Sequence, residues 1–309
     1  MPKRFKPGTI ATIIGTACVV AIAAVLFHPG SDSAQAFGSS ANSAGTPNLG
    51  NGKQIDPSRF AAGACEEFPP TSGDAHQTVF LDAGHGGIDP GGVGQTQSGT
   101  QVDESTVNLA IELDTAAILR AQGYTVVVSR TGNTTVTRLE AGDTDGTMLT
   151  LQGAHDDVAA RDLCANMADA TVLVGIYMDA GATGAAGCLT GYDPDRPFSA
   201  QNERLAGLLQ EDVLGAMNAQ GWDIPDGSVQ PDTGLGSSDS AAAQSYGHLM
   251  LLGPAEAGYF ETPSQMPGAL IEPLFLTDPF EGSIAASANG QQVIAGALAK
   301  AIRHYLTSS

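Results

Sequence analysis

Short apolar runs alternate with stretches of helical periodicity along most of the chain. Apolar residues recur at helical spacing between Val107 and Ile118, and Gly123 follows where this helix would end. Other periodic stretches predict helices over 157–167, 205–217 and 293–306. The short apolar runs, several of them β-branched, predict buried strands over 78–81, 124–129, 171–177, 249–252 and 269–272. Strands that alternate with helices in this way predict a single α/β domain over residues 75–307.

Polar stretches interrupt or precede this pattern. Residues 131–154 and 223–245 are rich in Gly, Thr, Ser and Asp, a composition typical of surface loops or insertions. The part of the chain before the domain, residues 28–74, begins with a tract rich in Ser, Gly, Ala and Asn. We interpret it as a flexible tether.

The first 27 residues have the pattern of an export or membrane-targeting segment. Residues 1–7 hold three basic side chains, and residues 8–27 form an apolar stretch without a charge. That length fits either a secretory signal peptide, with a cleavage site at Ala34-Gln35-Ala36, or a retained membrane anchor. Both alternatives place the domain outside the cytoplasm, because positive charge before an apolar stretch stays on the cytoplasmic side.

Charge limits the kinds of partner that the chain can bind. It carries 33 acidic residues against 13 basic ones, a formal net charge of −20. Such a surface repels the phosphate backbone of nucleic acids, so we expect no nucleic-acid partner.

Three cysteines, Cys65, Cys164 and Cys188, lie in the part of the chain that is expected to face an oxidising compartment. One pair can form a disulfide there and leave one free thiol. The sequence does not choose among the three pairings. It contains no Cys-x-x-Cys motif that would predict a cysteine-ligated metal.

Residues suited to metal chemistry fall at the ends of predicted elements. His85 follows the first buried strand within a glycine-rich run from Asp82 to Gly91, Glu104 begins the next helix, and Glu272 ends the last strand. Open α/β sheets carry their site residues at such strand ends, and a carboxylate that ends a buried strand needs a partner or a chemical role. One imidazole and two carboxylates at one edge of a sheet predict a zinc site with a general base.

These residues lie in motifs that occur in the order typical of a known family. The run from Val79 to Gly91 is similar to its opening signature, and Glu104, four residues before Asn108, stands where the family has a glutamate ligand. The run from Met266 to Leu276 is similar to its closing motif, which contains the catalytic glutamate. On these motifs the chain resembles the zinc-dependent N-acetylmuramoyl-L-alanine amidases of bacterial cell walls, amidase type 3.

The resemblance implies a fold, a metal and a reaction. The family folds as a mixed, mostly parallel sheet flanked by helices, and it binds one zinc ion through a histidine, a glutamate and a second histidine. His85 and Glu104 would be the first two ligands, and Glu272 would be the catalytic residue that activates water together with zinc. The bond cleaved would be the amide between N-acetylmuramic acid and the L-alanine of the stem peptide. Peptidoglycan is therefore the expected partner, and the N-terminal segment, if uncleaved, would add contact with the membrane.

The second zinc histidine is missing from its expected place. The family has Ser-Ile-His-x-Asn at the end of an apolar strand, where this chain has Tyr177 in the histidine position and Asp179 two residues later. A phenol ionises near pH ~10 and is a poor zinc ligand at neutral pH. Asp179, on the same strand face, is an alternative ligand. His155 and His248 are further alternatives, although we interpret them as surface or packing histidines.

Two hypotheses about activity remain open from the sequence. The first is an active amidase with an altered or weakened zinc site, which the presence of His85, Glu104 and Glu272 favours. The second is a catalytically inactive homologue that binds peptidoglycan or regulates another cell-wall hydrolase, which the loss of the second histidine favours.

Overall fold

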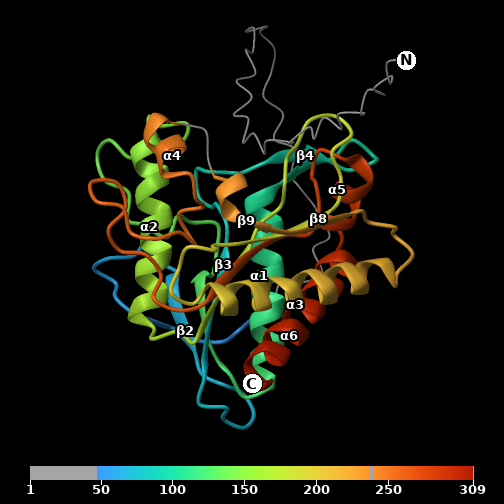
Figure 1. The fold of residues 1–309 in the computed structure, drawn as a ribbon, viewed down its shortest axis with the longest axis horizontal. Helices are drawn as coiled ribbons and strands as arrows, with labels where there is room; N and C mark the ends of the chain where they lie inside the picture. The colour runs from blue at the N-terminus through green and yellow to red at the C-terminus, as the bar shows by residue number, and fades with distance from the viewer. Residues whose placement is uncertain (1–46, 237–239, 309) are drawn as a thin grey trace, which may run out of the picture.

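An eight-stranded mixed sheet forms the centre of the molecule (Figure 1). The computed structural model describes residues 47–236 and 240–308. In order across the sheet, the strands are β1 (Lys53–Gln54), β2 (Ala64–Phe68), β6 (Thr125–Arg130), β3 (Thr78–Ala83), β7 (Val172–Ile176), β10 (Gly268–Glu272), β8 (Cys188–Tyr192) and β9 (Asp226–Pro231). The four strands β6, β3, β7 and β10 are parallel to one another, and β2 and β8 run antiparallel on either side of them. The predicted α/β domain with a mixed, mostly parallel sheet is confirmed.

Helices cover both faces of this sheet. On one face lie α1 (Glu104–Ala121), α3 (Ser199–Asn218) and α6 (Ala288–Thr307), and on the other lies α2 (Leu151–Met167), as Figure 1 shows. Shorter elements complete the fold: β4 (Val93–Gln95), β5 (Gln101–Asp103), the 3-10 turn η1 (Asp232–Gly234), α4 (Ala241–Tyr246) and α5 (Pro279–Ala285). The helices predicted over 107–118, 157–167, 205–217 and 293–306 are all present with longer bounds.

The central strands fill two hydrophobic cores because their side chains alternate between the faces. On β3, Val79 and Leu81 pack on the side of α1, whereas Phe80 packs on the side of α2. The parallel register also sets Ala83 beside Ile176, and Ile176 beside Ile271. The residues that end or follow β3, β7 and β10 therefore meet at one edge of the sheet, as the prediction of the site required.

Three segments differ from the prediction. The tether predicted over 28–74 is too long, because β1 and β2 lie within it and β2 pairs with β6. The apolar pattern of β2 is interrupted by two acidic residues at its centre, which are only half-buried. Residues 249–252 form a turn instead of a strand. The leucines of this turn pack into the core, but its backbone does not pair with the sheet. The stretch 223–245, predicted as a loop, contains β9 and most of α4.

The predicted targeting segment, residues 1–27, lies outside the described residues. Within residues 47–236 and 240–308, every helix is too short or too polar to cross a membrane.

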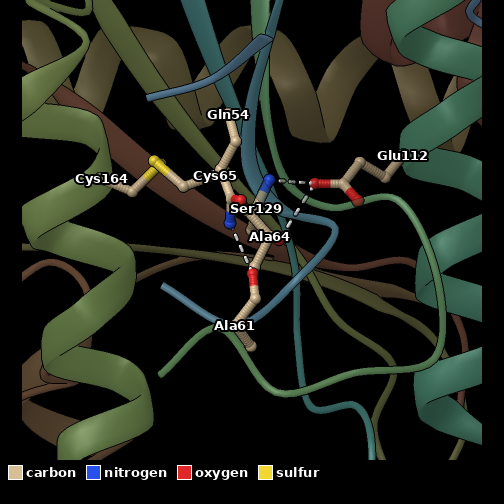
Figure 2. The surroundings of a disulfide bond; sticks show 7 residues. All are labelled: Gln54, Ala61, Ala64, Cys65, Glu112, Ser129 and Cys164. Carbon is tan, nitrogen blue, oxygen red and sulfur yellow. Dashed lines mark hydrogen bonds between the residues drawn. A yellow bond between two sulfur atoms is a disulfide. The ribbon is translucent and has the colours of Figure 1, made fainter. Parts of the chain in front are cut away.

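A disulfide joins Cys65 on β2 to Cys164 on α2, with 5.7 Å between the two Cα atoms (Figure 2). Both cysteines are completely buried, and Cys188 is a buried free thiol. The bond fastens the N-terminal part of the sheet to the helix on the adjacent face. Of the three pairings that the sequence left open, the structure forms the one that closes a loop of 99 residues.

Loss of this disulfide should strongly destabilise the domain. We expect the double variant Cys65→Ala/Cys164→Ala to lose about 3–5 kcal/mol of unfolding free energy, because the bond removes the closure entropy of a long loop from the unfolded chain. Denaturant titration measures the change. Cys188→Ala is the matched control, since it removes a buried thiol without a covalent bond. An equal loss in the two proteins would contradict a structural role for the disulfide.

Candidate active site

His85 lies in a loop that the sequence shapes for close approach to other groups. The loop follows β3, and His85 itself has a left-handed backbone with φ of 61°, a strained conformation that is common at functional sites. Gly91 has φ of 68°. A Cβ at Gly91 would come within 2.6 Å of both the His85 ring and the Glu104 carboxylate. This glycine therefore allows the loop to close around the two side chains.

Carboxylates face both nitrogens of the His85 ring. Nδ1 lies 2.7 Å from Asp89 Oδ2, and Nε2 lies 3.3 Å from Glu104 Oε2. Burial alone would lower the pKa of His85, but Glu104 and Asp89 outweigh burial and raise it to about 10. The site therefore favours a positive charge at this ring, either a proton or a metal ion bound at Nε2.

Glu104 is held firmly at the start of α1. Its Oε2 accepts a hydrogen bond from the Gly92 amide at 2.7 Å, and its Oε1 accepts from the Met178 amide at 3.0 Å and the Asn108 side chain at 3.1 Å. Burial alone would raise the pKa of Glu104, but His85 and the amides of Gly92 and Met178 lower it. Glu104 is therefore a fixed carboxylate anion directed at His85.

Two buried arginines fix the backbone that leads into the His85 loop. Arg130, at the end of β6, donates to the carbonyls of Ala83 and Gly84 at 3.1 Å each. Arg161, on α2, donates to the Ala83 carbonyl at 2.7 Å and the His85 carbonyl at 2.9 Å. The sequence analysis missed this positioning role, although a lone arginine at the end of an apolar strand is a signal for one.

Tyr177 occupies the position of the missing histidine, but its hydroxyl points to a different partner. It donates to Asp82 Oδ2 at 3.0 Å, and Asp82 Oδ1 is paired with Arg161 at 2.6 Å. Burial and the Asp82 carboxylate raise the pKa of Tyr177 well above that of a free phenol. The phenol therefore stays neutral and is not a metal ligand in this arrangement. Its ring contacts the His85 ring edge-on, with 5.6 Å between centroids.

Glu272 lies close to His85 and Glu104 and forms a hydrogen bond with Asp179. Burial, with the charges of Asp179 and Glu104, raises the pKa of Glu272 well above its usual range, while His85 opposes the rise. Two carboxyl groups in such contact share one proton, since both cannot be ionised at low cost. Asp179 is thus the hydrogen-bond partner of the predicted catalytic residue. In this arrangement it contacts Glu272, and it is not needed as the alternative zinc ligand.

The donor atoms suited to a metal ion are His85 Nε2 and Glu104 Oε2, which face each other. In the described part of the chain, no third His, Cys, Asp or Glu approaches this pair closely enough to complete a three-ligand cage. His155 bonds to Asp156 and to the Tyr259 carbonyl, and His248 contacts Asp193 and Asp232 instead. The residues present therefore fit a cation held by two protein ligands, which is a weaker site than one with three.

Another buried carboxyl group, that of Glu112 on α1, supports the strand ends behind this site. Its Oε1 accepts from the Ala83 amide at 3.2 Å and from the Ser129 amide at 2.9 Å, the latter drawn in Figure 2. Burial is the main cause that raises the pKa of Glu112 to about 8. The side chain is therefore a neutral acid at pH 7 and becomes an anion only in mildly alkaline solution.

Glu112 should make the domain less stable as the pH rises. The folded protein binds the Glu112 proton up to pH about 8, whereas the unfolded chain releases it near 4.5. The unfolding free energy should therefore fall through this window by about 1.4 kcal/mol per pH unit for this one proton. Glu112→Gln keeps the acceptor oxygen and cannot ionise, so its stability curve should be flatter by that slope. Parallel curves for the two proteins would contradict the assignment.

Known proteins resemble this chain over most of its length. A sequence model of the N-acetylmuramoyl-L-alanine amidases matches residues 79–304. The N-acetylmuramoyl-L-alanine amidase AmiA of Salmonella typhimurium is 30% identical over 237 residues, which cover 74% of this chain and 75% of AmiA. The uncharacterized protein YqiI of Bacillus subtilis is 28% identical over 230 residues, which cover 74% of this chain and 84% of YqiI.

Solved structures agree with the sequence comparisons. The crystal structure of an N-acetylmuramoyl-L-alanine amidase from Clostridium difficile 630 is 25% identical, with a TM-score of 0.51, and the match covers 77% of this chain and 100% of that one. The match of the family model extends over most of the chain. The chain belongs to the N-acetylmuramoyl-L-alanine amidase family.

Proposed function

We propose that the chain hydrolyses the amide between N-acetylmuramic acid and the L-alanine of the peptidoglycan stem peptide, with His85, Glu104 and Glu272 as its chemical groups. The observation that carries this proposal is the contact of His85 Nε2 with Glu104 Oε2 at 3.3 Å beside the hydrogen-bonded carboxyl pair of Asp179 and Glu272. Membership in the amidase family supports the same bond as the target.

His85 and Glu104 would hold a zinc ion between them. The hydrogen bond from His85 Nδ1 to Asp89 leaves Nε2 as the free ligand nitrogen, an arrangement common for metal-bound histidines. A bound zinc ion polarises the carbonyl group of an amide and lowers the pKa of water. Because Tyr177 supplies no third ligand, we expect weak retention of the metal.

The carboxyl pair supplies the proton transfers. Burial and the neighbouring Asp179 raise the pKa of Glu272. The pair would then hold one proton between its two members, so that it can accept a proton from the attacking water and donate one to the departing nitrogen. The C–N bond breaks, a C–O bond forms from water, and the stem peptide leaves with a free amino group on its L-alanine. Raised pKa values suit this role because they bring a carboxyl group closer to the working pH.

The substrate lies in the cell wall, and the first part of the sequence is consistent with delivery there. In this proposal residues 1–27 export the domain or anchor it in the membrane, and the tether ends before β1 at Lys53 instead of at residue 74, because β1 and β2 belong to the sheet. Protease added to intact spheroplasts should degrade the domain. A domain that remains protected would contradict export.

Digestion of purified peptidoglycan tests the proposed reaction. Wild-type protein supplied with zinc should release stem peptides whose N-terminal residue is L-alanine, identified by mass spectrometry, and should leave the glycan strands intact. His85→Ala should release none while retaining its fold by circular dichroism. Binding to peptidoglycan without release by the wild-type protein would favour the inactive homologue. Release of glycan fragments would contradict the proposed bond.

A further inference from the structure

A second group of ligand atoms lies at the end of the sheet opposite the candidate active site. Asp193 directly follows β8 and Asp232 directly follows β9, two parallel strands in which Tyr192 is paired with Pro231. Because β8 runs antiparallel to β10, these carboxylates lie near the start of β10, whereas Glu272 lies at its end. The imidazole of His248 reaches both carboxylates from the segment after α4.

Each carboxylate has one oxygen tied to the backbone and one directed at His248. Asp193 Oδ1 accepts from the Asp195 amide at 2.6 Å, and Asp232 Oδ2 accepts from the Leu249 amide at 3.1 Å. The other two oxygens, Asp193 Oδ2 and Asp232 Oδ1, lie 3.0 Å and 3.2 Å from His248 Nδ1. One candidate ligand atom from each residue therefore faces a common point, and both carboxylates are completely buried.

The group has more acceptors than donors. Nδ1 of His248 forms its hydrogen bond with Asp232, and the buried Asp193 Oδ2 is left without a hydrogen-bond partner. Arg196 is the nearby positive charge, but its guanidinium donates to the carbonyls of Leu252, Gly253 and Ser264. A buried carboxylate oxygen without a donor costs free energy unless a proton or a cation satisfies it.

We propose that Asp193, Asp232 and His248 form a divalent-cation site, separate from the candidate active site, that takes zinc. Two carboxylate oxygens and one imidazole nitrogen match the donor types of zinc, with a fourth position for water. Calcium needs six to eight oxygen ligands, which these residues do not supply. Nδ1 is the ring nitrogen of His248 that faces both buried carboxylates, while Nε2 lies on the side of the exposed Asp195, 3.8 Å from its Oδ2.

The site would fasten the far end of the sheet. Asn202 on α3 donates to the Asp193 carbonyl at 3.0 Å and accepts from the Gly268 amide, the first residue of β10, at 3.0 Å. Zinc at this point would join the ends of β8 and β9 to the segment at His248, and through Asn202 to the strand that ends in Glu272. Its role is therefore structural, and it does not depend on whether the first site is catalytic.

Zinc binding by the full-length chain, purified in mild detergent and stripped with a chelator, tests the proposal. The double substitution His85→Ala/Glu104→Ala removes both proposed metal ligands of the candidate active site. In this background we expect about one zinc ion per chain by elemental analysis, and an increase in melting temperature of several degrees with zinc. Adding Asp193→Asn/Asp232→Asn should abolish both effects. Magnesium in excess suppresses loose binding to the acidic surface.

Two further variants complete this experiment, a single ligand substitution and a matched control. Asp232→Asn alone keeps an oxygen for the Leu249 amide, so a loss of zinc binding without a loss of fold by circular dichroism would identify a ligand. His76→Ala removes an exposed histidine paired with Asp74 and should leave zinc binding unchanged. Absence of zinc from the His85→Ala/Glu104→Ala protein would overturn the proposal, as would equal zinc content before and after Asp193→Asn/Asp232→Asn.

Discussion

Glu272→Gln should reduce the release of stem peptide from peptidoglycan by about 100-fold to 10,000-fold, the range expected when a general acid or base is removed. Glutamine fills the same space and can still bond to Asp179, but it cannot exchange a proton with water or with the departing nitrogen. The loss should appear in kcat, with little change in KM, because the side chain acts on the reaction more than on binding. Peptide release under saturating zinc measures both constants.

Fold and metal content provide the controls for this variant. Glu272 is not one of the proposed ligands, so the zinc content of Glu272→Gln should equal that of the wild-type protein, and its melting temperature should not fall. Asp179→Asn is the matched change on the other member of the pair, and it should lower the rate less. Full activity in Glu272→Gln would contradict the assignment of the proton transfers to this pair.

Tyr177→His should increase the affinity for zinc by about 100-fold or more, judged from the tenfold to hundredfold effects of residues that contact a zinc ligand only indirectly. A neutral imidazole binds the metal without first losing a proton at pH ~7, whereas a phenol has to ionise about three pH units uphill. In this chain the Asp82 carboxylate and burial make that ionisation harder still. Competition with a chromophoric chelator measures the affinity.

Tyr177→Phe separates the gain of a ligand from the loss of the Asp82 hydrogen bond. It keeps the ring against His85 and removes the hydroxyl, so its zinc affinity should match the wild-type value. Peptide release that appears only in Tyr177→His would indicate that the wild-type protein is an inactive homologue. Equal zinc affinity in the histidine and phenylalanine variants would contradict the account of position 177.

The central strands and the long helices were predictable because their patterns are strong and local. The runs that became β3, β6, β7 and β10 are apolar on both faces, as buried parallel strands are. Their parallel arrangement also brings the ends of β3 and β10 to one edge, so the neighbourhood of His85 and Glu272 followed from their positions at strand ends.

The outer strands were harder to predict because tertiary contacts determine them. β2 has two half-buried acidic residues at its centre, Glu66 and Glu67, and becomes a strand only by pairing with β6. β9 consists mostly of polar and small residues and depends on pairing with β8. The disulfide between Cys65 and Cys164 depends on the same placement of β2. The local sequence around each cysteine therefore could not predict this pairing.

At the site, the sequence identified residue types but not their directions. Nothing in the order Gly175-Ile176-Tyr177 shows that the phenol points to Asp82, because that partner comes from another strand. The hydrogen bond between Asp179 and Glu272 likewise joins the segment after β7 to the end of β10, which meet only in the fold. His248 was interpreted as a surface or packing histidine because its carboxylate partners lie 16 or more residues away.

The central claim is that His85 and Glu104 together hold the metal ion of the amidase site. X-ray diffraction from zinc-soaked crystals, recorded on both sides of the zinc absorption edge, tests this claim most directly. The account predicts an anomalous peak in contact with both His85 Nε2 and Glu104 Oε2, beside Glu272 and without contact to the Tyr177 hydroxyl. Crystals of active protein that show zinc elsewhere but none between these two atoms would contradict it.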